Sequence, residues 1–246
     1  MDGPNRNYKT VKKMHFEKPR TIVEHIYTGI ATSISQGLLK PGQPLREREI
    51  QEWFGVSRSP IREAIRLLEA DGLVIVDNYK KKYVRNMTSK DFKDISLCLA
   101  CLEGFVANLA TLALTEKQID NMQTISEGIR KTIQQENCSL CAELNLKFHK
   151  SYVKIINNEQ IIKTIRPMTK TIVWFWLTHF YYKHLNLAAF SIDEHQKMIE
   201  AFRRKDAAKA EEETRKHIIN SHERLLEVSA FDSNGNYIIP SSEETK

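Results

Sequence analysis

The sequence predicts a mainly α-helical protein, with an N-terminal winged helix-turn-helix followed by an all-α antiparallel helical bundle. Helical apolar spacing covers most of the chain, and strand-like patterns are confined to a short stretch near residue 80. Residues 1–90 hold 17 Lys and Arg against 10 Asp and Glu, a net charge of +7, whereas the whole chain carries +6. A basic head on a near-neutral body indicates a nucleic-acid-binding module joined to a second domain.

Two helices are predicted before residue 55. An apolar row at four-residue spacing predicts the first helix, over Arg20–Gln36, and the row consists of Ile22, Ile26, Ile30 and Ile34. Pro41-Gly42-Gln43-Pro44 separates this helix from a second one over Arg46–Phe54. In the second helix we expect Ile50, Trp53 and Phe54 to face inward, and Gly55 to end it.

The third predicted helix carries the most informative pattern in the chain. It lies within Gly55–Gly72, where Ser57 or Ser59 can cap it and Pro60 suits its first turn. Its inward face is formed by Ile61, Ala64, Ile65 and Leu68, and Gly72 is expected to end it in a left-handed conformation. Its exposed start carries Ser57, Arg58, Ser59 and Arg62, which are suited to guanine edges and phosphates in the major groove.

Two short strands complete the predicted head. Leu73–Val76 and Lys82–Arg85 are apolar or alternating segments on either side of a polar turn, which is typical of a β-hairpin. A basic hairpin after three helices indicates a winged helix-turn-helix. The rival interpretation is a small helical bundle with a charged surface. It does not explain why residues 1–90 carry a net charge of +7.

The remaining residues are helical by pattern, and their number is enough for one further core. The predicted helices are Lys90–Leu114, Thr115–Gln135, Ser139–Asn157, Gln160–Lys183, Ser191–Lys205 and Asp206–Val228. We therefore divide the chain into a disordered tail (1–18), the DNA-binding domain (19–88), a second, all-helical domain (89–230) and a C-terminal tail (231–246). We recognise no signal peptide and no run long enough to span a membrane, which predicts a cytoplasmic protein without a membrane partner.

Three histidines of the second domain could converge. Asn145 and His149 are four residues apart, so they point the same way from one helix. His195 and His217 lie at similar distances from a predicted chain reversal near residue 205, which would bring them level on antiparallel helices. Imidazoles with an open position suit Zn²⁺ or Ni²⁺. Spacing alone nevertheless favours three ordinary core or surface histidines.

The head resembles the GntR family of bacterial transcription regulators. The resemblance rests on three segments: Pro41-Gly42-Gln43-Pro44-Leu45-Arg46-Glu47-Arg48-Glu49-Ile50, Gly55-Val56-Ser57-Arg58-Ser59-Pro60-Ile61-Arg62-Glu63-Ala64-Ile65, and Asp71-Gly72-Leu73-Val74. It implies that Arg48, Arg58 and Arg62 contact DNA, and that Ser57 and Ser59 flank the first recognition arginine. The chain departs from the family at the wing tip, where the usual glycine is replaced by Asn78-Tyr79.

The second domain is similar to the FCD ligand-binding domain of FadR-like GntR regulators. The similarity rests on Asn145-Leu146-Lys147-Phe148-His149, Glu194-His195-Gln196-Lys197-Met198-Ile199 and Arg215-Lys216-His217. It implies a divalent metal held by Asn145, His149, His195 and His217, and a small organic acid beside it as effector. Two positions differ from the family: Asn145 stands where Asp is commoner, and Leu99 replaces an Arg four residues before Glu103.

Two other functions stay open at this stage. The pairs Cys98/Cys101 and Cys138/Cys141 have a C-x-x-C spacing that could hold zinc or act as a thiol switch, although such spacing in a helix also marks one packed face. A metal-dependent hydrolase could use three histidines to activate water, but no carboxylate stands at a spacing that marks a general base. We therefore predict a non-enzymatic regulator, with repression as its expected effect. It would be a homodimer on a pseudo-palindromic DNA operator, controlled by a carboxylate effector.

Overall fold

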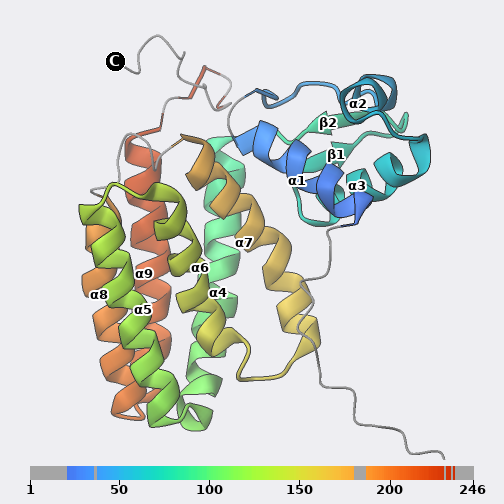
Figure 1. The fold of residues 1–246 in the computed structure, drawn as a ribbon. Helices are drawn as coiled ribbons and strands as arrows, with labels where there is room; N and C mark the ends of the chain where they lie inside the picture. The colour runs from blue at the N-terminus through green and yellow to red at the C-terminus, as the bar shows by residue number, and fades with distance from the viewer. Residues whose placement is uncertain (1–20, 36–37, 180–186, 230, 234, 236–246) are drawn as a thin grey trace, which may run out of the picture.

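The computed structural model describes residues 21–35, 38–179, 187–229, 231–233 and 235 (Figure 1). A small N-terminal unit lies beside a bundle of long helices. In chain order the described elements are α1 (Ile22–Ser35), α2 (Glu47–Phe54), α3 (Arg58–Ala70), β1 (Val74–Val76), β2 (Lys82–Val84), α4 (Ser89–Ala113), α5 (Glu116–Gln134), α6 (Cys138–Val153), α7 (Glu159–His179), α8 (Leu187–Arg203) and α9 (Ala207–Glu227).

The N-terminal unit is the winged helix-turn-helix that the sequence predicts. Helix α1 packs on α3, and β1 pairs with β2 in an antiparallel hairpin. Gly55 ends α2 with φ 64°, and Gly72 follows α3 with φ 76°. Both values lie in the left-handed region that favours glycine. The core of this unit includes Ile26, Ile30, Ile34, Ile50, Ile61, Ala64, Ile65 and Leu68.

One residue expected to face inward is exposed. Trp53 is 52% exposed. Successive helix positions are about 100° apart, so an eight-residue helix turns only part of its surface to the core. Phe54, one turn after Ile50, takes the inner place against Gly29. The prediction for Trp53 was therefore wrong.

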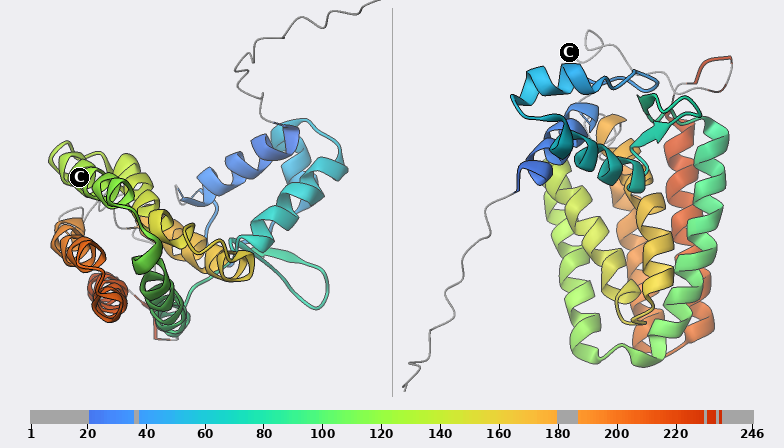
Figure 2. Two further views of the ribbon diagram at one scale, coloured as in Figure 1. Left: turned by 90° about the horizontal axis from the view of Figure 1, so that it is seen from below. Right: turned by 90° about the vertical axis from the view of Figure 1, so that its right-hand side faces the viewer.

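The C-terminal part is an all-helical bundle in which α4 packs along α9 and also contacts α6, α7 and α8 (Figure 2). Its helices begin where side chains satisfy free backbone N–H groups. Thr88 with Asp91, and Thr115 with Gln118, form the reciprocal hydrogen bonds of a capping box. Helix α8 begins four residues before the predicted position, at Leu187.

Helix α4 corrects the expectation that no segment could span a membrane. Its 25 residues are long and apolar enough on length and composition alone. Half of its most apolar 18-residue window is buried inside the bundle. The helix also carries the buried carboxylate of Glu103, which hydrogen bonds to another helix. These features are typical of the central helix of a bundle, whose apolar length serves packing.

Helix α7 connects the two parts of the molecule, since it lies between the bundle and the N-terminal unit in both figures. Its residues Lys170 and Arg166 pair with Asp71, the residue that caps the C-terminal end of α3. A Cβ on Gly72 would lie 2.5 Å from the hydroxyl of Thr171. The chain therefore needs a glycine here for two reasons, its positive φ and its close approach to α7.

Candidate DNA interface and metal centre

All five side chains predicted to read DNA lie on the surface of the head. Arg48, Ser57, Arg58, Ser59 and Arg62 are exposed, and the Arg48 side chain is 86% accessible. Ser57 occupies the N-cap position of α3, but its side chain makes no capping hydrogen bond. Its hydroxyl is thus available to an outside acceptor, such as a phosphate oxygen.

The arginines of this surface are held by neighbours on α2. Arg58 donates to Gln51 over 3.2 Å, and Arg62 donates to both carboxylate oxygens of Glu47 at 3.2 and 3.0 Å. These contacts hold both guanidiniums outward at the start of α3. Arg58 and Arg62 share one exposed face because they are one turn apart.

Glu47 links the recognition helix to the wing, a role the sequence analysis missed. It accepts hydrogen bonds from Arg62 and from Lys82 of β2, the latter over 2.9 Å. Burial alone would raise the pKa of the Glu47 carboxyl, but these two donors lower it below its usual range. The carboxylate therefore stays charged and sets the position of β2 relative to α3.

The wing tip has a formed turn despite lacking the usual glycine. The side chain of Asp77 accepts the backbone N–H groups of Tyr79 and Lys81, each over 2.8 Å. Lys80 takes the positive φ of 61° in this turn. Tyr79 is 83% exposed, so a large aromatic side chain projects from the wing.

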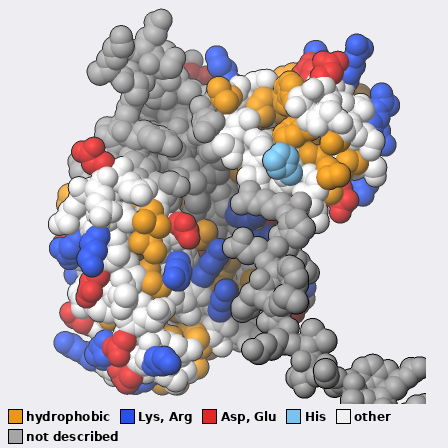
Figure 3. Space-filling view, in the orientation of Figure 1, with side chains coloured by type: hydrophobic (Ala, Val, Ile, Leu, Met, Phe, Trp, Pro, Cys, Tyr) orange, Lys and Arg blue, Asp and Glu red, His pale blue; other side chains and the backbone are white. Residues whose placement is uncertain are grey.

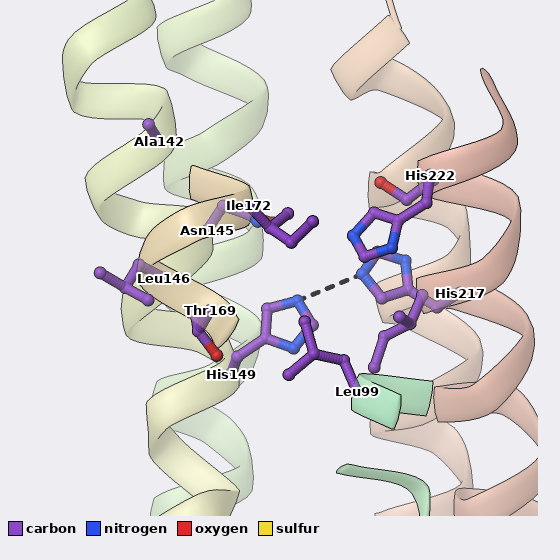
Figure 4. Close-up of a pocket in the computed structure, with 11 residues that line it drawn as sticks. Leu99, Ala142, Asn145, Leu146, His149, Thr169, Ile172, His217 and His222 are labelled. Atoms are coloured by element: carbon purple, nitrogen blue, oxygen red, sulfur yellow. Dashed lines mark hydrogen bonds between the residues drawn. The ribbon is translucent and has the colours of Figure 1, made fainter. Parts of the chain in front are cut away.

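In the helical bundle, three of the four predicted metal ligands meet. His149 on α6, His195 on α8 and His217 on α9 offer ring nitrogens that all lie within 4.8 Å of one another. Figure 4 shows the rings of His149 and His217 pointing toward each other. Their Nε2 atoms are 3.2 Å apart. His195 and His217 are almost completely buried. The convergence of these three histidines, which the residue spacing allowed and the family resemblance implied, is therefore present in the structure.

A carboxylate orients each of two rings, and of these Glu103 is buried whereas Glu194 is partly exposed. Nδ1 of His149 lies 2.8 Å from Glu103, which also accepts the Tyr152 hydroxyl over 2.6 Å. Nδ1 of His217 lies 2.9 Å from Glu194. Burial would raise the pKa of both carboxyl groups, but their hydrogen-bond partners lower it, to about 2 for Glu194. An ionised carboxylate can only accept, so each Nδ1 carries the hydrogen and each Nε2 presents its lone pair.

These donors fit a metal ion. Two Nε2 lone pairs facing each other over 3.2 Å repel unless a cation or proton lies between them. His195 is fully buried, and neither of its ring nitrogens has a hydrogen-bond partner among the described residues. Burial lowers the pKa of His195 well below its usual value, which keeps the ring neutral and able to bind a metal. A histidine held by a carboxylate behind it is the common form of a metal ligand. The cluster is therefore a possible metal site.

A small cavity of about 60 Å³ adjoins the cluster. Its lining includes the fourth predicted ligand, Asn145, together with Leu99 in place of the family's arginine. Two further polar residues line it that the sequence analysis did not select, His222 and Thr169. Nδ1 of His222 and the Thr169 hydroxyl are buried without a hydrogen-bond partner among the described residues. Burial lowers the pKa of His222 to about 3. The ring is therefore neutral at pH 7.

The three cysteine side chains that the structure describes do not form a comparable site. Cys98 and Cys101 are exposed on α4, Cys141 is buried on α6, and the side chain of Cys138 lies outside the described part. Of the His, Cys, Asp and Glu side chains that the structure describes, the three histidines form the one group of three or more with metal-binding geometry. The i, i+3 spacing of Cys98 and Cys101 marks one face of a helix.

Comparison with known proteins assigns both parts of the chain. Residues 22–83 match the gntR family of bacterial regulatory proteins, and residues 94–220 match the FCD domain. The chain is 28% identical over 214 residues to YdhC, an uncharacterised HTH-type transcriptional regulator of Bacillus subtilis, covering 86% of this chain and 94% of that protein. It is 23% identical to the HTH-type transcriptional repressor RspR of Escherichia coli, covering 85% and 91%.

A solved structure has the same fold. McbR/YncC of E. coli superposes with a TM-score of 0.66 at 18% identity, covering 85% of this chain and 97% of that chain. The two family matches together span most of the sequence, from the start of α1 to α9. The chain therefore belongs to the GntR family, in the branch with a C-terminal FCD domain, and is a transcription regulator rather than an enzyme.

Proposed function

We propose that this protein is a cytoplasmic repressor that binds a pseudo-palindromic operator and is controlled by a small organic acid bound beside a metal ion. The observation that carries the proposal is the pair of exposed arginines, Arg58 and Arg62, at the start of α3. The printed description of RspR as a repressor supports repression as the direction of control.

On the DNA side, α3 would enter the major groove. Arg58 and Arg62 would form paired hydrogen bonds with guanine, and Arg48 with the hydroxyls of Ser57 and Ser59 would hold the phosphate backbone. The Arg62 guanidinium must then break its hydrogen bonds to Glu47 and form new ones to a base edge. The second contact of Glu47, with Lys82, keeps that carboxylate paired when Arg62 leaves.

In the bundle, His149, His195 and His217 would hold Zn²⁺ or Ni²⁺, with Asn145 as a fourth ligand through its amide oxygen. A bound metal ion would carry a positive charge, and a carboxylate effector could ligate that ion. Glu103 and Glu194 fix the rings in the orientation that binding requires. Asn145 is neutral, so the site keeps more positive charge for an acid than the commoner Asp would leave.

A second copy of the chain would cover the exposed apolar face of α4. This face carries Leu97, Phe105, Leu109 and Leu112, each more than 40% exposed, at helical spacing. Exposed apolar rows of this kind mark interfaces. A two-fold axis beside this face would also place two DNA-binding domains in one dimer, as a pseudo-palindromic operator needs.

The test is binding to an operator selected from random DNA by the full-length protein. Arg58→Ala should weaken specific binding by about 1–3 kcal/mol, as expected for a lost paired contact to guanine. Arg203→Ala removes the same charge from α8, where Arg203 pairs with Glu116 and Asp120, and should leave operator affinity unchanged. Equal affinities and footprints for the wild type and Arg58→Ala would refute the assigned recognition surface.

A further inference from the structure

A second and larger cavity lies between α6 and α7. Its volume is about 430 Å³, and we call it the α6/α7 groove. Three residues, Leu146, His149 and Thr169, line both this groove and the cavity at the histidine cluster. The two spaces are therefore neighbours, and one ligand could occupy both.

The charge of the groove is one-sided. Its lining contains no carboxylate among the described residues. Four cations line it: Lys150 on α6, Lys154 just after the end of α6, and Arg166 and Lys170 on α7. Figure 3 shows Lys and Arg side chains gathered over α6 and α7 on this face of the molecule. Among the described residues, Lys150 and Lys154 have no acidic partner, whereas Lys170 and Arg166 both pair with Asp71 of the head.

The small volume of the cavity at the histidine cluster indicates that the effector extends into the α6/α7 groove. A cavity of about 60 Å³ has room for an ion and a few water molecules, since one water needs about 10–15 Å³ measured in this way. An organic acid with a second anionic group needs more space than this. The groove supplies that space, and its cations supply the partners for a second anionic group.

We propose that the α6/α7 groove binds a phosphate group of the effector through Lys150, Lys154, Arg166 and Lys170. The inference deepens the proposed function, because it takes the groove to be part of the same effector site. A phosphate carries close to two negative charges near neutral pH, which suits several cations better than a single carboxylate does. The effector class is then a phosphorylated organic acid, with its acid group at the histidine cluster and its phosphate in the groove.

The groove also connects the ligand to DNA binding. Asp71 caps the recognition helix, is 6% exposed and shares Lys170 and Arg166 with the groove. A phosphate bound there competes with Asp71 for the same two cations. Binding would thus loosen the contact between α7 and the end of α3, which alters how firmly the head is held.

The experiment measures binding of inorganic phosphate to the full-length protein by titration calorimetry. The double variant Lys150→Gln with Lys154→Gln should lose at least about tenfold in phosphate affinity, which corresponds to 1.4 kcal/mol. The matched control, Lys147→Gln with Lys163→Gln, removes two charges from the same helices outside the groove lining and should bind phosphate as the wild type does. Both doubles keep the three histidines, so phosphate held by a metal would be unaffected in either.

Equal affinity in both doubles, or no saturable phosphate binding by the wild type, would overturn the groove assignment. Neither result would touch the proposed function, which is tested by operator binding and metal content. A third variant tests the link to the head. Asp71→Asn removes the competing carboxylate and should tighten phosphate binding severalfold, whereas unchanged affinity would show that the cations are not shared.

Discussion

The ammonium group of Lys170 donates a hydrogen bond to the carboxylate of Asp71 and joins the helical bundle to the residue that caps the C-terminal end of the recognition helix. The same carboxylate accepts the Tyr27 hydroxyl over 2.7 Å, and Lys170 also donates to that hydroxyl over 3.1 Å. Burial, followed by the hydrogen bond to Asp71, raises the pKa of Tyr27 far above its usual value, so the hydroxyl stays protonated. Three groups from α1, α3 and α7 therefore share one polar contact between the two parts of the protein.

Removing the ammonium group from this contact should destabilise the protein. Lys170→Met leaves the buried Asp71 carboxylate without its main cation, which should lower the free energy of unfolding by about 1–3 kcal/mol. Urea unfolding followed by circular dichroism measures the loss. Lys163→Met is the control on the same helix, because Lys163 forms an exposed pair with Glu159 and should cost at most about 0.5 kcal/mol. Equal losses in the two variants would mean that the Asp71 contact contributes no more than a surface pair.

The histidine cluster predicts a metal content that depends on particular rings. His149→Ala with His217→Ala should abolish metal that copurifies with the protein, measured by elemental analysis after gel filtration. His222→Ala should retain the metal, since His222 lines the cavity but is not one of the three converging rings. Glu194→Gln should weaken metal affinity about 10–100-fold, because it removes the charge behind His217. Metal retained by the double histidine variant would place the ion elsewhere.

Sequence patterns and family resemblance predicted much of this arrangement, and the reasons differ by element. Helix positions followed from apolar spacing and capping residues, because these act within a few residues of each other. Thr115 with Gln118 is such a local pair, and its side chains form a capping box at the predicted start of the helix. The convergence of His149, His195 and His217 depended on the resemblance, since spacing alone favoured ordinary histidines.

The partners that complete the site could not be predicted, because they belong to no local pattern. Glu194 meets His217 from another helix, and Tyr152 meets Glu103 across 49 residues of sequence. The contact between Lys170 and Asp71 spans 99 residues. The prediction for Trp53 was wrong although its spacing from Ile50 fits an inward face, because Phe54, one residue later, lies against Gly29 of α1 and Trp53 stays exposed. Such contacts depend on how helices far apart in the sequence pack together, and a single sequence contains no local pattern that predicts this packing.

If the apolar face of α4 is the dimer interface, a single charged residue introduced there should dissociate the subunits. Phe105→Asp should place a carboxylate inside the proposed interface, where an unpaired charge costs several kcal/mol. Sedimentation should then find monomers at concentrations where the wild type is a dimer. Leu140→Asp, at an exposed position near the start of α6, is the control and should leave the mass unchanged. Dimers that persist in Phe105→Asp would assign the interface to another surface.

The buried ring of His222 predicts a loss of stability in acid. Burial lowers its pKa from 6.5 to about 3, so between these values the unfolded chain binds a proton that the folded protein does not. The free energy of unfolding therefore falls as pH falls below 6.5, by about 1.4 kcal/mol per pH unit for this ring. His222→Gln should flatten the dependence by that amount in urea unfolding between pH 6 and 4. Chelator in every sample removes the separate pH dependence of metal binding. The exposed His25 on α1 is the matched control, and His25→Gln should keep the slope of the wild type. A slope that is the same in His222→Gln as in the wild type would show that this ring takes up its proton before the protein unfolds.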